Sequence, residues 1–278
     1  MRIINLIENT EGKSGCIFAH GLSFYVETAH HKLLVDLGPS PDTLENAKTL
    51  GIDLSAVDTV ILSHGHYDHS GGIIPFSKIN TKASIYMQSL ATGEYFADDG
   101  ENAEGERFRY IGIDKDILSL PGVRLISGDC VIDDELELFT IKNRTHELPF
   151  TNRRLLIKTP DGFVRDDFAH EHFLVVCDEG KKVLISGCAH NGILSIMDAY
   201  RTKYGSAPDA VISGFHLMKK TDYREDQLKE IREIAKELTA YPTKFFTCHC
   251  TGVPAYEAMK EIMGDSLEYV HSGDEVIL

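Results

Sequence analysis

Short apolar runs separated by polar turns make up the first part of this chain. Residues 2–8 and 22–38 are rich in β-branched and aromatic side chains, and the longer segment contains a polar turn, so we expect strands in both. Residues 40–51 have a proline near their start and a glycine at their end, which predicts a short helix. Residues 57–63 are then expected to form a buried strand.

The last hundred residues return to a regular order of strands and helices. The expected elements are a strand pair at 172–187, a helix at 192–205, a strand at 209–214, a helix at 222–238, a strand at 243–249, a helix at 253–264 and a final strand pair at 267–278. The helix at 222–238 is amphipathic, and we expect its apolar face to pack into the core. That face carries Leu228, Ile231, Ile234, Ala235 and Leu238.

The pattern is weaker in the middle of the chain. Residues 82–88 and 123–128 have the composition of strands. Residues 91–112 are expected to form an irregular surface segment, and residues 140–172 a loop that begins and ends in strands. The order of elements as a whole predicts an α/β fold in which helices cover sheets.

Histidine follows four of the predicted strands. The sequences concerned are ILSHGHYDH (61–69), LISGCAH (184–190), VISGFH (211–216) and FFTCHC (245–250). In layered α/β folds, ligand sites form where loops leave the ends of strands. We therefore expect one site to which all four segments contribute.

Composition narrows the class of protein. The length of 278 residues fits one domain spanning residues 1–278. A formal net charge of −15 argues against nucleic acid as a partner, because binding to its backbone depends on Lys and Arg. The apolar runs are too short to cross a bilayer, and residues 1–10 do not resemble a secretory signal. Six irregularly spaced cysteines predict reduced thiols in a cytoplasmic protein. The expected partner is a small-molecule substrate. The oligomeric state is left open.

The turn at His64–His69 is the densest group of metal-competent side chains in the sequence. Residues i and i+2 of an extended segment point the same way, so His64 and His66 can bind one ion together. Asp68 and His69 follow a bend and can face a second ion. We expect Gly65 to relieve crowding and Gly71–Gly72 to let the chain turn sharply. Imidazole nitrogen with carboxylate oxygen suits zinc, and also iron or manganese.

The turn HGHYDH resembles the H-x-H-x-D-H signature of the metallo-β-lactamase superfamily. This resemblance implies an αββα four-layer sandwich with a one- or two-metal site along one sheet edge. The superfamily hydrolyses lactams, thioesters, phosphodiesters and lactones, and it includes redox members. Further segments occur in the order AHGLSFYVE, LLVDLG, SGCAHNGI, SGFHL and CHCTG. Together they resemble the branch of dihydropterin–ribofuranosylaminobenzene phosphate synthase-like hydrolases.

The resemblance implies roles for individual residues. His64 and His66 match the first-metal pair, and His190 is expected to complete that set. Asp68, His69 and His249 match the ligands of the second metal, and Asp68 is also expected to act as general base. Three further residues are predicted to lie at the pocket. His216 would orient substrate or donate a proton, and His20 and Glu171 would contribute to substrate binding, Glu171 from behind the ligands.

Some assignments are open at this stage. Many superfamily members have aspartate where this chain has Cys188, and no bridging carboxylate is evident. Cys188 is either a thiolate ligand or a small buried residue. Cys248 and Cys250 are expected to pack away from His249. His146 is a reserve ligand, His170 and His172 have no assigned role, and His30, His31 and His271 are expected at the surface.

The sequence therefore predicts a metal-dependent hydrolase. One or two divalent ions, zinc first and iron or manganese as alternatives, would activate hydroxide for attack on an ester, lactone, phosphodiester or related small molecule, including pterin- or phosphate-containing compounds. A di-iron redox enzyme of the same fold is one alternative, although no bridging carboxylate is evident and the chain has no room for a flavin domain. A non-catalytic ligand-sensing protein is another, against which the intact ligand set argues.

Overall fold

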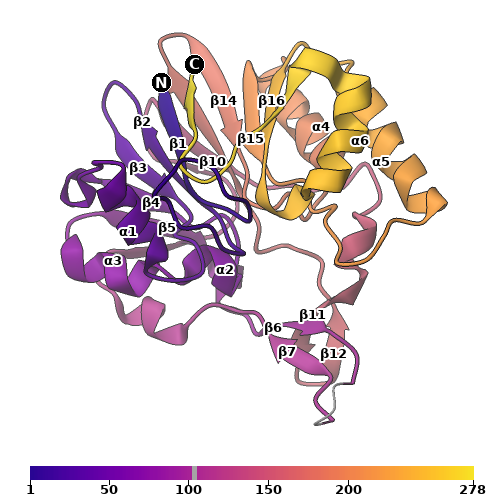
Figure 1. Ribbon diagram of the computed structural model, residues 1–278. Helices are drawn as coiled ribbons and strands as arrows, with labels where there is room; N and C mark the ends of the chain where they lie inside the picture. Colours follow the sequence, from indigo (N-terminus) through magenta and orange to yellow (C-terminus); the bar gives the residue numbers. More distant parts are fainter. Residues whose placement is uncertain (102–104) are drawn as a thin grey trace.

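Two seven-stranded sheets lie face to face in the computed structural model, which describes residues 1–101 and 105–278 (Figure 1). Helices cover the outer face of each sheet, so the molecule has four layers in the order helix, sheet, sheet, helix. The expected αββα sandwich is confirmed.

The first sheet and its helices come from the N-terminal half, with one strand from the C-terminus. In spatial order its strands are β18 (Glu275–Ile277), β1 (Arg2–Ile7), β2 (Ser23–Glu27), β3 (Lys32–Val35), β4 (Thr59–Ile61), β5 (Ser84–Gln88) and β8 (Val123–Ile126). Its helices are α1 (Asp42–Thr49), α2 (Tyr67–Ser70) and α3 (Ile73–Ile79). Strands β3, β4, β5 and β8 are parallel, so their carboxyl ends meet at one edge.

The second sheet has the same number of strands. They are β17 (Leu267–Tyr269), β16 (Lys244–Thr247), β15 (Ala210–Ser213), β14 (Lys181–Ile185), β13 (Phe173–Asp178), β10 (Leu136–Phe139) and β9 (Cys130–Val131). The helices that cover it are α4 (Ile193–Tyr204), α5 (Glu225–Leu238) and α6 (Val253–Met263). Strands β14, β15, β16 and β17 are parallel, and the first three each end in a histidine-bearing loop. Short 3₁₀ helices lie at Leu54–Ala56, Ser89–Thr92, Lys115–Ser119, Phe150–Arg154, His249–Thr251 and Gly264–Ser266.

The alternation of side chains along β13 builds two layers of core at once. Leu174 and Val176 enter the cluster between the two sheets, while Phe173 and Val175 enter the cluster under α4, α5 and α6. Successive residues of a strand point to opposite faces, so a strand covered on both sides is apolar throughout. The predicted face of α5 lies in the outer cluster, where Ile231, Ala235 and Leu238 are buried, as expected.

The predicted strand pair at 267–278 is wrong. Both segments are strands, but β17 pairs with β16 of the second sheet and β18 pairs with β1 of the first. The turn between them crosses from one sheet to the other rather than forming a hairpin. Strand composition predicts extended backbone but carries no information on the partner.

A third sheet projects from the sandwich near the bottom of Figure 1. This arm sheet has the order β12 (Gly162–Arg165), β11 (Leu155–Thr159), β6 (Tyr95–Asp98) and β7 (Phe108–Tyr110). Two expectations are corrected here. Residues 91–112 contain the strands β6 and β7, and residues 102–104 lie outside the described residues. The strands within 140–172 lie in the middle of that segment. The pairing of β6 with β11 joins residues about sixty positions apart, which local pattern cannot reveal.

The composition predicts reduced thiols and apolar runs too short to cross a bilayer. All six cysteines are free, as predicted. Among the described residues, no helix combines the length and the apolar character that a bilayer crossing requires.

Replacing Leu174 by alanine should destabilise the fold by about 2–5 kcal/mol, because its side chain is 1% exposed between the two sheets. Urea unfolding followed by circular dichroism measures this. The control is Val164→Ala on the arm sheet, where the side chain is 47% exposed and the cost should stay within about 0.5 kcal/mol. Equal costs for the two variants would contradict the layer assignment.

Candidate metal centre

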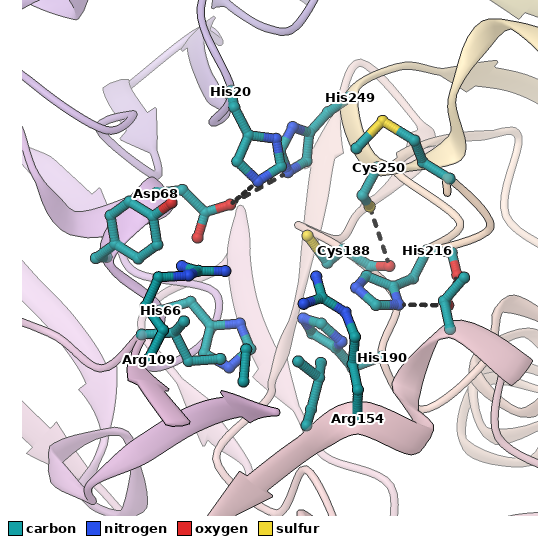
Figure 2. Close-up of a pocket in the computed structure, with 16 residues that line it drawn as sticks. His20, His66, Asp68, Arg109, Arg154, Cys188, His190, His216, His249 and Cys250 are labelled. Carbon is teal, nitrogen blue, oxygen red and sulfur yellow. Dashed lines mark hydrogen bonds and ion pairs between the residues drawn. The ribbon is translucent and has the colours of Figure 1, made fainter. Parts of the chain in front are cut away.

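The histidine-bearing loops converge at one end of the sandwich. The turn from His64 to His69 follows β4 of the first sheet, and Cys188 with His190 follow β14 of the second. His216 follows β15, and His249 follows β16. Figure 2 shows side chains from all four loops facing a common cavity.

A first cluster consists of His64, His66 and His190. One ring nitrogen from each lies within 4.8 Å of the others. The ring centroids of His64 and His66 are 4.6 Å apart, and each lies 4.8 Å from that of His190. The structure thus brings together the three residues predicted to hold the first metal.

A second cluster consists of Asp68, His69 and His249. Their potential ligand atoms also lie within 4.8 Å of one another. Asp68 Oδ2 is 3.8 Å from His69 Nε2 and 3.7 Å from His249 Nε2. Extended backbone ends at His66, which has φ −111° and ψ 149°, and α2 begins at the next residue. This change of backbone conformation separates the two predicted pairs into neighbouring clusters.

The glycines after the turn have a different role from the expected one. Gly71 has φ −61° and Gly72 has φ −85°, values that any residue adopts. Glycine is required because an added Cβ would lie 2.1 Å from the Pro39 carbonyl oxygen or 2.3 Å from that of Leu37. Gly65 does relieve crowding as expected, since its Cβ would lie 2.7 Å from the Ala91 oxygen.

Several ring nitrogens of the two clusters have a lone pair without a hydrogen-bond partner, and a metal ligand needs such a lone pair. Eight buried side-chain nitrogen or oxygen atoms have no hydrogen-bond partner in the part of the chain that the structure describes. Four of them are the Nε2 atoms of His64, His66, His190 and His249. An unpaired buried polar atom is costly, and a metal ion would remove that cost. The residues present therefore fit one or two divalent ions.

Hydrogen bonds fix the tautomers of three of these imidazoles, those of His64, His190 and His249. His190 Nδ1 donates to Asn152 Oδ1 at 3.0 Å, and His249 Nδ1 donates to Asn9 Oδ1 at 2.8 Å. His64 Nδ1 lies 2.8 Å from Ser63 Oγ, whose proton goes to Asp36, so His64 also donates. In each ring the proton is on Nδ1, and Nε2 keeps its lone pair. A hydrogen bond to the second ring nitrogen is the usual support of a metal-binding histidine.

Asp36 supports both parts of the turn, and the sequence analysis missed it. Its carboxylate accepts from the Ser63 backbone N–H at 2.8 Å, from Ser63 Oγ at 2.7 Å and from His69 Nδ1 at 2.7 Å. The side chain is completely buried, and its φ of 61° is unusual for a residue other than glycine. An acidic residue directly after the apolar strand β3 was the available signal, since β3 neighbours β4.

Glu8 and Asn9 support the second cluster from the first loop of the chain. Glu8 accepts from the His249 backbone N–H at 2.9 Å and from the Tyr269 hydroxyl at 3.1 Å. Asn9 bridges His249 and His20, because its amide nitrogen lies 3.4 Å from His20 Nδ1. Both follow β1 directly, but no feature of the local sequence marked them.

The segment from Asp166 to His172 passes behind the first cluster. Glu171 accepts from the backbone N–H groups of His190 at 2.8 Å and Asn191 at 2.9 Å. His170 Nδ1 accepts from the Gly65 N–H at 2.9 Å, and its Nε2 donates to Asp166 at 3.0 Å. Glu171 is buried and does not line the cavity, so the structure does not bring it to the expected substrate position. It positions the loop that carries His190.

Both ring nitrogens of His172 have hydrogen-bond partners, so this histidine has no free lone pair. Its Nε2 donates to the Leu62 carbonyl at 2.8 Å, and its Nδ1 accepts from Gln88 Nε2 at 3.2 Å. Burial lowers its pKa to about 4, so the ring is neutral. With both nitrogens occupied, His172 is a structural residue.

Burial sets the charge of the cluster imidazoles. It lowers the pKa of His64, His66, His190 and His249 well below 6.5, and the neighbouring imidazoles lower it further. Burial also opposes protonation of His69, but Asp36 and Asp68 outweigh it and raise its pKa. The four rings with unpaired Nε2 atoms are therefore neutral near pH 7, the state that binds metals.

Two of the three cysteines near the centre, Cys188 and Cys250, line the cavity. Cys188 Sγ lies 3.1 Å from His69 Nε2 and within 4.8 Å of ligand atoms in both clusters. Cys250 lines the same cavity, although Cys248 is buried between the sheets as expected. The prediction for Cys250 fails because His249 has φ 50° and begins a 3₁₀ turn, which ends the alternation of an extended strand. Burial raises the pKa of the Cys188 thiol, so a bound cation would be needed to deprotonate it.

His216 and His20 line the cavity, as predicted. His216 Nδ1 lies 2.8 Å from Thr151 Oγ1, and that hydroxyl donates its own proton to the His216 carbonyl. Nδ1 must therefore be the donor, which leaves Nε2 as an acceptor. Burial, with a contribution from Arg154, lowers the pKa of His216 to about 3. His20 is half exposed, and its Nε2 lies 3.4 Å from Asp68 Oδ2.

The other histidines lie outside the centre. His146, the reserve ligand, pairs with Asp198 at 3.2 Å and lines a separate cleft. His30 is exposed, with 78% of its side chain accessible. His31 and His271 are only partly exposed and bind Asp58 and Thr10, respectively.

Comparison with known proteins extends these observations. The model of the family described as "Metallo-beta-lactamase superfamily" matches residues 17–241. The chain is 28% identical to the 7,8-dihydropterin-6-methyl-4-(beta-D-ribofuranosyl)-aminobenzene-5'-phosphate synthase of Methanocaldococcus jannaschii, over 98% of this chain and 95% of that protein. An uncharacterized protein of the same organism is 29% identical over 96% of each chain.

Solved structures show the same fold. Tm1679, described as a metal-dependent hydrolase of the beta-lactamase superfamily, has a TM-score of 0.81 and 26% identity, and covers 100% of this chain and 99% of its own. Zn²⁺-bound PqqB from Methylobacterium extorquens has a TM-score of 0.57 at 12% identity and covers all of both chains. The second likeness concerns the fold alone.

Replacing His64 and His66 together by alanine should remove about one equivalent of bound metal while the fold is retained, because the two lone pairs face the same cluster. Mass spectrometry of the dialysed protein for metals, with circular dichroism for the fold, measures both quantities. His146→Ala is the matched control and should keep its full metal content. Unchanged metal content in the double variant would refute the assignment.

Stability of the metal-free protein should fall as the pH drops from 6.5 to 4. The folded state keeps His172 neutral down to a pKa of about 4, whereas the unfolded chain protonates it near 6.5. The unfolded state therefore binds more protons in this window, and the free energy of unfolding falls by on the order of 3 kcal/mol from this group. Urea titrations of the chelated protein at pH 7.5, 5.5 and 4.5 measure the slope. His172→Asn should reduce it and His30→Asn should not; equal slopes would contradict the assignment.

Proposed function

Because this chain belongs to the metallo-beta-lactamase superfamily, we propose that it is a metal-dependent hydrolase of a small-molecule ester, lactone or phosphodiester. One observation carries the proposal: four neutral, buried imidazoles aim unpaired Nε2 atoms at two adjoining clusters beside a cavity. Divalent cations held there would lower the pKa of water from about 15.7 to roughly 7 and would stabilise negative charge on the attacked group.

Asp68 is the acidic side chain best placed to take part in the reaction. Its carboxylate lines the cavity and lies beside His20, His69 and His249. Burial alone would raise its pKa, but these three imidazoles lower it, so the group is ionised. We assign it the orientation of the attacking water and acceptance of its proton.

His216 is assigned a role as hydrogen-bond acceptor rather than proton donor. The contact with Thr151 places the ring proton on Nδ1, and the remaining nitrogen accepts from groups in the cavity. With a pKa of about 3, its imidazole does not hold a second proton near pH 7. Of the two roles expected for His216, this proposal keeps the orientation of substrate and gives up the donation of a proton.

Zinc fits the donor set best. The first cluster offers nitrogen only, and the second offers nitrogen, one carboxylate and the adjacent thiol of Cys188. Zinc takes nitrogen, sulfur and carboxylate ligands, whereas di-iron redox centres favour more carboxylates. The named relative from Methanocaldococcus jannaschii is a synthase, which supports a second candidate, transfer to an acceptor other than water. A cytoplasmic location, small-molecule substrates, and no nucleic acid or membrane partner stay predictions.

Replacing Asp68 by asparagine should lower turnover by about 10²–10⁴-fold, the range typical for loss of a general base. The assay is a panel of esters, lactones and phosphodiesters with zinc-loaded protein, with metal content measured in parallel. Asp134→Asn, an exposed carboxylate outside the cavity, is the control and should keep full activity. Full activity of Asp68→Asn would refute its role. Absence of hydrolysis with fully loaded protein, and product only when an organic acceptor is added, would favour the transferase.

A further inference from the structure

Two arginines of the arm sheet face the metal centre. Arg109 lies in β7, and Arg154 ends the 3₁₀ helix that leads into β11. Both line the cavity that contains the two clusters, and Figure 2 shows both guanidinium groups directed toward its interior. They are the only Lys or Arg among the cavity's described lining residues.

One carboxylate holds the two guanidinium groups together. Asp99, directly after β6, forms an ion pair with Arg109 Nε at 2.7 Å through Oδ2 and with Arg154 Nη1 through Oδ1. A guanidinium has five N–H donors, and these contacts use one on each arginine. The group formed by the three side chains has a net charge of +1 and donors in excess of its acceptors.

Aromatic contacts fix the arm sheet to the metal centre. The Tyr95 ring of β6 lies 4.1 Å from that of His170 and 5.9 Å from that of His66. Phe168 belongs to the same small core and stacks on His190, with centroids 4.7 Å apart and planes inclined by 3°. Because buried rings connect the arm sheet to the clusters, the backbone that carries Arg109 and Arg154 is held beside the centre, and the ion pairs with Asp99 hold the two guanidinium groups.

Neighbouring arginines do not share this placement. Arg107 of the same hairpin is paired with Asp98 through two hydrogen bonds and does not line the cavity. Arg153, adjacent to Arg154 in sequence, lines the separate cleft that also contains Glu230. In a chain with a net charge of −15, two cations converging on one cavity are a local exception.

The size of the cavity shows which part of a substrate it receives. Its volume is about 90 Å³, far below the roughly 300–1,000 Å³ of pockets that enclose drug-sized ligands. A molecule reacting at the clusters therefore places only its reacting group inside. The rest of the substrate molecule then lies at the rim of the cavity, where the side chains of Arg109 and Arg154 are about half exposed.

We propose that Arg109 and Arg154, held by Asp99, form a binding site for an oxyanion substituent of the substrate, a phosphate or carboxylate separate from the bond that reacts. This rests on the proposed function for the nature of the reaction, but not for the binding itself. Guanidinium groups match the geometry of both oxyanions through paired N–H donors. The substrate class is thus an anionic small molecule whose charged group contacts the arm while its reacting group contacts the centre.

The test is titration calorimetry with inorganic phosphate and, separately, acetate, on the protein as purified and after removal of metal by a chelator. The variants are Arg109→Gln, Arg154→Gln and the double variant, with Arg107→Gln and Arg153→Gln as matched controls. We expect the double variant to weaken binding of the preferred anion at least tenfold in both forms of the protein, and the controls to change it less than twofold. Tighter binding of phosphate or of acetate identifies the substituent.

Two results would overturn the proposal. One is anion binding that disappears with the metal and is unaffected by the arginine substitutions. The other is equal weakening by the control substitutions, which would indicate a general field effect. Failure of the proposed function would give a different result. Anion binding that depends on the two arginines, without hydrolysis of any substrate, would support this site and refute only the hydrolase activity.

Discussion

A buried imidazole nitrogen without a hydrogen-bond partner costs about 1–3 kcal/mol, and this protein places four of them at one point. The hydrogen bonds around the centre leave those lone pairs without a partner. Asn152, Asn9 and Ser63 each accept a hydrogen bond from the opposite ring nitrogen, Nδ1, of a cluster histidine. Rotation of the ring or a change of tautomer would break that hydrogen bond. The two sheets are the scaffold for this arrangement, because only their packing brings the loops after β4, β14 and β16 to one end of the molecule.

The sequence predicted the two clusters because their key feature is local. Three histidines and an aspartate lie within six residues, and a change from extended to helical backbone is enough to divide them between two positions. His190 and His249 were added through the resemblance to the superfamily, and the structure accounts for their position, since each follows an apolar strand whose parallel neighbours end at the same edge. Asp36, Glu8 and Asn9 could not be found this way, since their role depends on contacts across 27 to 241 positions of sequence.

Dependence on the three-dimensional structure also explains which predictions from the sequence are wrong or incomplete. Cys250 was placed on the wrong face because strand alternation was extended past Thr247, where β16 ends. The arm sheet was missed because β7 is largely exposed and because β6, besides pairing with β7, pairs with β11 about sixty positions away. The roles of His170 and His172 were open because residue type alone does not distinguish a ligand from a structural histidine. What distinguishes them is that both ring nitrogens of His170 and His172 already have hydrogen-bond partners.

The position of β18 has a consequence for synthesis of the protein on the ribosome. This strand comes from the last residues of the chain, yet it completes the first sheet by pairing with β1, and the preceding loop binds Glu8 and Asn5. Elongation proceeds at about 5–20 residues per second. For several seconds after the N-terminal half has been made, β1 therefore lacks its neighbour β18 and forms an open edge of the first sheet. Cells that overproduce the protein would thus accumulate nascent chains in which β1 is an unpaired edge strand, the kind of edge on which chains pair with one another.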